Sequence, residues 1–409
     1  MKANLLILIL LTSSTMVMSQ SLVEKRFKKQ APDLELYDAK LGDWHFDGKL
    51  KLGIGYDDNS TSASLSSRQE EGGYFTSGLD LALYNQFTQD FSIDTNFYVG
   101  YKWWTSGDNQ DELIFNTSGD TLAFDWDLNE KTKLSFIDRF RMNTSTVQEL
   151  ADGEGSNELR LMTNDAAIQL FHEINEDNEF GIKVGYTTRD ELTGDFDFLD
   201  RDDLYAGLLF SHLLSQKTKL GVFLNGFRYD WDENINNDGK EWQIGLSVDH
   251  AITNLILLKT TLGWQDLHFE DDRAGSVDAD EEGHGLFGGF AINHIVSEKF
   301  WHNFAVDFRR RISSDNRVNF SEVLTFTYGA TWNVNSDLYI NPSIVYIYTD
   351  KQNNIGVENG LFRPTFTIGY DITSKMNVEV TYIFTNNDSD THDIDYNRNQ
   401  IMMNLTYDF

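Results

Sequence analysis

The chain has 409 residues with 33 Lys and Arg and 65 Asp and Glu, so its formal net charge is −32. This acidic balance excludes a nucleic-acid-binding protein, because nothing would neutralise a phosphate backbone. The sequence has no cysteine, which excludes a disulfide framework and a thiolate metal site, and its aromatic content of 13% is too high for a disordered chain.

The first residues are typical of an export signal. Lys2 precedes an apolar run from Leu5 to Leu11, and cleavage is expected after Ser19. Residues 1–19 are therefore predicted to be a signal peptide. Residues 20–44 are predicted to be a periplasmic leader, too short for a folded plug. The apolar run is shorter than a membrane-spanning helix needs, and no later run is longer.

From residue 46 the sequence alternates between apolar and polar positions. Even positions from Phe46 to Tyr56 are apolar or Gly, and the odd positions between them are polar or Gly, which predicts a strand with two different faces. The run at 91–103 has the same pattern and the length that a tilted membrane strand requires. Pro342 and Pro364 lie on the apolar face of two such runs, so bulges or strand ends are expected there. Further alternating runs lie at 242–248, 286–292, 300–308, 324–332, 338–348, 362–370 and 376–384.

The connections between the runs alternate between eight short turns and nine long loops, which predicts 18 strands with 16 as the lower bound. Short periplasmic turns, long acidic outer loops and an even strand count are typical of an all-β transmembrane antiparallel up-and-down β-barrel, here over residues 45–409. The runs at 112–126 and 219–231 change phase, so each is expected to contain a bulge or a break. A soluble β-sandwich is the alternative fold, and strand length and the rings clustered at both strand ends argue against it.

The chain ends on an alternating strand that includes Tyr407 and closes on Phe409, which we interpret as a terminal assembly signal for the barrel assembly machinery. Gly53 to Tyr56 run directly into the corner Asp57-Asp58-Asn59. With the export signal and the terminal strand, this corner resembles the bacterial β-barrel porin 2 family and related exopolysaccharide-associated outer-membrane proteins. The resemblance implies a channel or a secretion-associated barrel, and it carries over no functional residue.

Most basic residues of the strands lie on the polar face and are expected to point into the lumen. One interpretation is that they form an ion-selective or sugar-selective constriction, as charged rings do in pores. The other is that they pair with inward acids and only keep the wall hydrated. The candidates are Lys49, Lys51, Lys102, Arg139, Arg141, Lys183, Lys259, Arg309, Arg311 and Arg363.

The outer loops suggest a weak cation site. Asn234, Asn236 and Asp238 space oxygen ligands like the start of a calcium-binding loop, but position twelve of that frame is Gly245 rather than Glu. A solvated, repulsive loop surface is the favoured interpretation. Five histidines recur beside short turns, and we interpret them as amphipathic rings at the lipid boundary rather than metal ligands: His172, His212, His250, His294 and His302.

The sequence therefore predicts a porin-like channel in the outer membrane of a Gram-negative bacterium. It would pass small solutes or saccharides passively, or form the outer-membrane part of a polysaccharide export system. The expected partners are outer-membrane lipid and lipopolysaccharide, the assembly machinery and the solute, with no cofactor and no enzymatic activity. The alternatives are a barrel hydrolase, for which only His284 and His392 are candidates, and a non-conducting adhesive or scaffold barrel.

Overall fold

The computed structural model describes residues 39–59, 71–105, 111–116, 121–144, 160–192, 199–232, 236–270, 283–313, 318–351, 357–390 and 395–409. The expected signal peptide and most of the leader lie outside these ranges. No helix in the described residues has the length and apolar character needed to cross a membrane.

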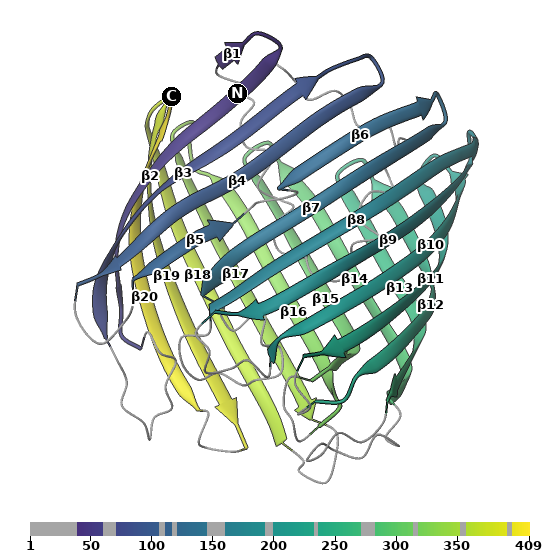
Figure 1. Cartoon of the computed structure of the whole chain (residues 1–409). Coiled ribbons are helices and arrows are strands. Elements are labelled where there is room, and N and C mark those ends of the chain that lie inside the picture. The colour runs from purple at the N-terminus through teal and green to yellow at the C-terminus, as the bar shows by residue number, and fades with distance from the viewer. Residues whose placement is uncertain are drawn as a thin grey trace.

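The regular structure is a single sheet of 20 strand segments, labelled in Figure 1. Their bounds are β1 Ala39–Leu41, β2 Trp44–Asp57, β3 Gly72–Gln86, β4 Phe91–Trp104, β5 Glu112–Asn116, β6 Leu122–Asn129, β7 Thr132–Thr144, β8 Arg160–Asn175, β9 Asn178–Glu191, β10 Arg201–Ser215, β11 Thr218–Trp231, β12 Gly239–Thr253, β13 Ile256–Phe269, β14 Gly283–Ser297, β15 Phe300–Ile312, β16 Phe320–Asn333, β17 Leu338–Lys351, β18 Val357–Thr373, β19 Met376–Ser389 and β20 Tyr396–Asp408.

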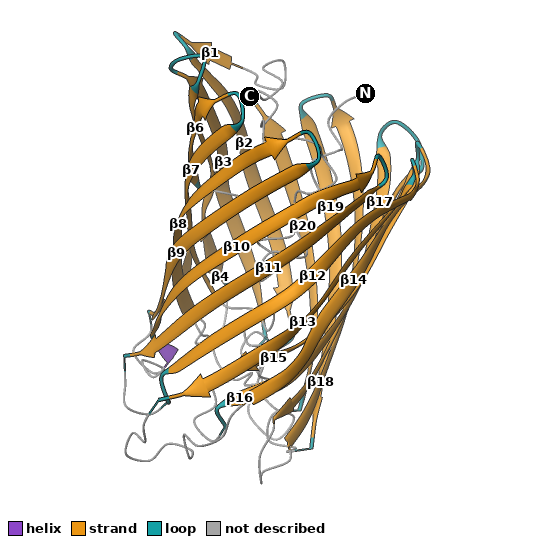
Figure 2. Cartoon of the chain, turned by 90° about the vertical axis from the view of Figure 1, so that its right-hand side faces the viewer, coloured by secondary structure: helices purple, strands orange, loops and turns teal. Residues whose placement is uncertain are grey.

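The sheet closes into an antiparallel barrel of 18 strands, as the sequence predicted. Each strand pairs with the next, and β20 returns to pair with β2. Two of the 20 segments add no further strand to the ring. β1 pairs only with the first residues of β2, while β5 and β6 lie end to end between β4 and β7. The short turns gather at one end of the tilted strands (Figures 1 and 2).

The alternating pattern gives the barrel two chemically different faces. On β2, Leu50, Leu52 and Ile54 point outward and are 41%, 45% and 48% exposed, whereas Asp57 points inward and is fully buried. β2 has 14 residues, or about 46 Å, which a tilt of 35–45° reduces to about 35 Å along the barrel axis. Since the apolar band of a membrane barrel is about 25 Å tall, the strands are long enough to extend beyond it.

The two predicted phase changes have different outcomes. The first is a real interruption, because the strand between β4 and β7 is split into β5 and β6. The second expectation was wrong: β11 is continuous over Thr218–Trp231, and it keeps one register along its whole pairing with β12. The change of phase there comes from the side chains alone, since the aromatic residues Phe223, Tyr229 and Trp231 lie at buried inward positions and Arg228 and Asp230 lie at outward ones.

The expectation that the two prolines mark bulges or strand ends was also wrong. Pro342 lies inside β17 and Pro364 inside β18. The β16–β17 ladder lacks pairs between Gly329↔Ser343 and Trp332↔Ile340, and the β18–β19 ladder lacks pairs at 363 and 364, without a register shift in either case. Because proline has no N–H to donate, each one interrupts the ladder on one side, and the intact ladder between β17 and β18 holds the strands in line.

The short turns have a common cause in the sequence. In eight of them an Asn, Ser or Thr at or just after the end of the strand accepts a hydrogen bond from the backbone N–H two residues later, which closes the chain into a tight turn. These residues are Thr88, Asn129, Asn175, Ser215, Thr253, Ser297, Asn335 and Thr373.

Candidate functional site in the barrel lumen

The cross-strand pairing places every predicted lumen residue on the inward face, because directly opposed residues share a face. Lys49 lies opposite Asp80 and Asp408, and Lys259 lies opposite Asp249. The remaining candidates occupy equivalent inward positions on six strands, β2, β4, β7, β9, β15 and β18: Lys51, Lys102, Arg139, Arg141, Lys183, Arg309, Arg311 and Arg363.

Most of these basic side chains have acidic neighbours. The Nζ atom of Lys51 lies 2.8 Å from Asp80, and Arg139 lies 3.2 Å from Asp165. Arg309 donates two hydrogen bonds, of 2.6 and 2.5 Å, to Asp307. These wall charges are therefore paired, as the second interpretation of the sequence expects, and their role in hydration or selectivity stays a prediction.

Tyrosine hydroxyls are a second set of polar groups on the wall, and the sequence did not predict them. Tyr205 donates a 2.6 Å hydrogen bond to Asp165, and Tyr229 donates one of 2.5 Å to Glu241. The ring of Tyr205 lies directly against Gly185, where an added Cβ would meet it at 2.3 Å. A cross-strand glycine thus lets a lumen tyrosine lie flat on the wall instead of standing into the channel.

The inward face also carries buried apolar clusters that were not predicted. Phe223 and Phe287 lie with ring centroids 6.1 Å apart above two intervening glycines, Gly245 and Gly263, and Leu209 packs against them. Further clusters consist of Val323, Val345, Ile347 and Leu361, and of Leu267, Phe269 and Phe320. The sign of these clusters in the sequence is the presence of apolar residues at positions that the alternation assigns to the inward face. The alternation identifies such residues only as exceptions and does not show that they pack together.

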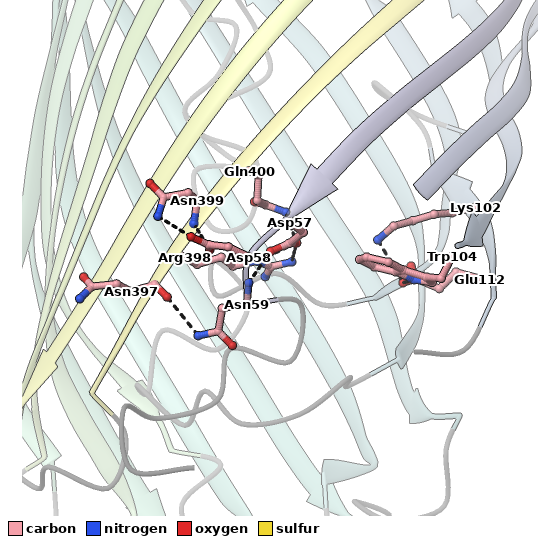
Figure 3. A network of polar contacts seen from close by, with 10 residues as sticks. All are labelled: Asp57, Asp58, Asn59, Lys102, Trp104, Glu112, Asn397, Arg398, Asn399 and Gln400. Carbon is pink, nitrogen blue, oxygen red and sulfur yellow. Dashed lines mark hydrogen bonds and ion pairs between the residues drawn. The ribbon is translucent and has the colours of Figure 1, made fainter. Parts of the chain in front are cut away.

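The Asp-Asp-Asn corner after β2 joins the first strand to the last (Figure 3). Arg398 of β20 donates to both carboxylate oxygens of the fully buried Asp57, at distances of 2.5 to 3.0 Å. Asp58 accepts hydrogen bonds of 2.6 and 2.7 Å from the backbone N–H and side-chain amide of Asn399. We call this set of contacts the seam clasp; it also includes Asn59 Nδ2 donating to the carbonyl of Asn397 and Gln400 Nε2 donating to Asp57.

Beside the seam clasp, a cation lies between aromatic rings. Lys102 forms an ion pair of 3.3 Å with Glu112 (Figure 3). Its ammonium also lies 4.0 Å from the ring centroid of Trp104 and 4.7 Å from that of Tyr74. These contacts fix Lys102 on the wall at the loop end of the barrel.

The C-terminal residue contacts β2 at the opposite end of the β2–β20 pairing, which we call the seam. The backbone N–H of Phe409 donates a 3.1 Å hydrogen bond to the carbonyl of Gly48, and its ring lies where a side chain at that glycine would be. Tyr407 pairs with Leu50 of β2. The proposed role of Tyr407 and Phe409 as an assembly signal stays a prediction.

The weak cation candidates have structural roles where they are described. Asn234 lies outside the described residues. Asp238 accepts a 2.8 Å hydrogen bond from the backbone N–H of Trp231, and Asn236 is buried. Among the described residues no group of three or more His, Asp or Glu is arranged to hold a metal ion.

The five turn-side histidines belong to different strands and lie at outward positions. His172 and His250 each contact the hydroxyl of a threonine on the preceding strand at 2.9 Å, and His212 contacts Asn178 at 3.0 Å. Only His294 and His302 contact each other, at 3.1 Å. Of the two enzyme candidates, His284 stacks on Trp264 and His392 lies outside the described residues.

The comparisons with known proteins agree with the architecture. A BenF-like porin from Pseudomonas fluorescens Pf-5 matches with a TM-score of 0.54 and 11% identity over 91% of this chain and 100% of that one. OccAB4 from Acinetobacter baumannii matches with a TM-score of 0.50 and 11% identity over 89% and 98%. OccK2 from Pseudomonas aeruginosa, whose structure contains glucuronate, matches with a TM-score of 0.50 and 10% identity over 89% and 98%.

At these identities the likeness shows the fold alone. No family model and no curated protein matches the chain, so the resemblance to the β-barrel porin 2 family still rests on the residues given above. The barrel, its apolar outer face and its polar inner face define a porin-like outer-membrane β-barrel.

Proposed function

We propose that the chain is a passive channel for small solutes, including saccharides, in the outer membrane of a Gram-negative bacterium. The observation that supports this proposal is the inner wall, on which ion pairs such as Lys51–Asp80 and Arg139–Asp165 alternate with bonded tyrosine hydroxyls such as that of Tyr205. A polar wall inside an 18-strand ring is typical of a water-filled path, because wall side chains alone do not fill so wide a barrel.

The remaining partners follow from the same proposal. Export through the signal at residues 1–19 would deliver the chain to the barrel assembly machinery, with Tyr407 and Phe409 at the recognised end. The exposed apolar residues of the outer face, such as Leu246 and Leu262, would contact outer-membrane lipid, including lipopolysaccharide.

Reconstitution tests the channel directly. The purified protein should give stepwise conductance in planar bilayers, and liposomes that contain it should swell faster in a monosaccharide solution than in an isosmotic tetrasaccharide solution. If the wild type gives no conductance, and a variant without residues 20–38 gives none either, the barrel is plugged, adhesive or enzymatic rather than a channel.

A further inference from the structure

Four of the short turns carry a lysine at the same position, directly before the first residue of the next strand. The backbone carbonyl of each lysine accepts a hydrogen bond of 2.7 or 2.8 Å from the strand that follows. All four side chains are exposed, and none forms an ion pair within the described part of the chain. They are Lys131, Lys217, Lys299 and Lys375.

At two of these turns the outward residues beside the lysine are polar. Thr132, the first residue of β7, lies opposite His172 on β8, and Thr218, the first residue of β11, lies opposite His250 on β12. In both pairs the threonine Oγ lies 2.9 Å from the histidine Nδ1. We call each lysine with its threonine and histidine a Lys-Thr-His unit; the first contains Lys131 and the second Lys217.

The other two turns have the same backbone frame without the polar pair. Phe300 lies opposite Trp332 beside Lys299, and Met376 lies opposite Tyr407 beside Lys375. The chain therefore contains its own comparison, in which the lysine is kept and its neighbours are large apolar or aromatic residues.

The contact inside each Lys-Thr-His unit has a chemical consequence for the imidazole. A hydroxyl that donates to Nδ1 leaves the proton of the neutral ring on Nε2. The ring then has an N–H donor on the outer face beside the exposed ammonium of the lysine, with no change of protonation. An ammonium and an N–H donor together suit a phosphate group, because they offer it both an opposite charge and a hydrogen bond.

The Lys-Thr-His units lie where the apolar outer face ends. From Thr218, β11 continues towards the loop end with the outward residues Leu220 and Val222, which are 37% and 48% exposed, while Lys217 lies in the turn. A lipid whose acyl chains cover Leu220 and Val222 therefore has its headgroup at the level of Thr218 and His250. Since the short turns are expected on the periplasmic side, this lipid belongs to the periplasmic leaflet.

The second unit has fewer acids beside it than the first. Glu130 precedes Lys131 and Glu173 follows His172, whereas the equivalent residues of the second unit are Gln216 and Ala251. Because nearby carboxylates oppose the attraction of an anion, the second unit should bind an anion more tightly.

We propose that the two Lys-Thr-His units bind the phosphate of anionic phospholipids in the periplasmic leaflet. The lysine ammonium pairs with the phosphate charge, the histidine Nε2–H donates to a phosphate oxygen, and the acyl chains cover the apolar residues above. The inference rests on the proposed outer-membrane location, but it does not depend on conduction through the lumen.

Native mass spectrometry of the folded protein in detergent, titrated with phosphatidylglycerol, tests this proposal. The wild type should retain two phosphatidylglycerol molecules, and it should not retain diacylglycerol with the same chains, which lacks the phosphate. Lys217→Gln should weaken the tighter binding step about tenfold, since a charged hydrogen-bond donor is lost, and His250→Leu should weaken it about fivefold.

Lys299→Gln is the matched control, because it removes the same charge from a turn of the same frame that lacks the Thr–His pair. It should leave the tighter step within about twofold, and gel mobility without heating should show that every variant is folded. Equal weakening by Lys217→Gln and Lys299→Gln would overturn the proposal in favour of a general charge effect of the rim, and so would equal retention of diacylglycerol. Displacement of the lipid by an equal concentration of inorganic phosphate would assign the units to a soluble anion instead. Lipid binding without conductance would count against the channel and not against the units.

Discussion

At the scale of single residues, the most informative contact is that of Asp57 with Arg398. The two residues are 341 positions apart in sequence, and the carboxylate has no exposure to water. A buried charge is tolerated only when its partner and further donors are present. Gln400 and the backbone N–H of Asn59 are those further donors.

Removal of either partner of this pair should therefore destabilise the barrel. Asp57→Asn or Arg398→Gln should each lower the free energy of unfolding by about 3 kcal/mol, because each leaves the other residue without its partner. Urea unfolding of the liposome-embedded protein measures the effect. The exposed pair Arg228–Asp230 supplies the control, and Arg228→Gln should change stability by less than about 0.5 kcal/mol. A coupling energy near zero in the Asp57/Arg398 double-mutant cycle would show that the seam clasp contributes nothing.

At the scale of the strand, alternation decides which substitutions are tolerated. Leu246 on β12 points outward, is 58% exposed and lies between Val222 and Leu262 on the neighbouring strands. Gln243 on the same strand points inward and contacts Glu241. The same residue, arginine, can thus be introduced at two positions of one strand, one that faces outward and one that faces inward.

Leu246→Arg should destabilise the barrel by about 2–4 kcal/mol if Leu246 is near the bilayer midplane, because the charge would lie in hydrocarbon. Gln243→Arg should have little effect, since the new guanidinium would lie beside Glu241. Equilibrium unfolding in liposomes compares the two. Equal losses of stability would mean that the two faces do not differ in environment as their exposure and composition indicate.

The two-faced character of the strands is the feature that the sequence predicted best. The spacing of Leu50, Leu52 and Ile54 predicts a two-faced strand because the side-chain period of a strand is two wherever it lies. Contacts that depend on register, such as Lys51 with Asp80 or Tyr205 with Asp165, were not predictable, because no local pattern specifies which residue lies opposite. The roles of Gly185 and Gly245 were missed for the same reason, since the ring that covers each comes from another strand.

At the scale of the whole molecule, the even strand number and the division into short turns and long loops were predictable from the sequence. The meeting of the two chain ends was not, since it brings together residues at opposite ends of the sequence. The lumen was predicted only in part: its basic residues and inward acids such as Asp80 and Asp307 were located, but which acid pairs with which base was not predicted, nor were the apolar clusters around Phe223 and Val345.

The closed ring should make the protein resistant to detergent. The purified protein is expected to require detergent for solubility and to migrate faster on a gel when unheated than when boiled, because each of the 18 strands of the ring is paired on both sides. Gel mobility with and without heating measures this. A monodisperse protein in plain buffer would contradict the membrane barrel and favour the β-sandwich.

The two contacts at opposite ends of the seam have a geometric consequence. A slip of β20 by two residues against β2 would keep every side chain on its face, but it would separate Arg398 from Asp57 and Phe409 from Gly48. In a closed barrel, the stagger accumulated around the ring is the shear number, and together with the number of strands it determines the radius. The residues where the chain begins and ends its circuit thus select one shear among those that alternation alone allows, and with it the bore of the pore.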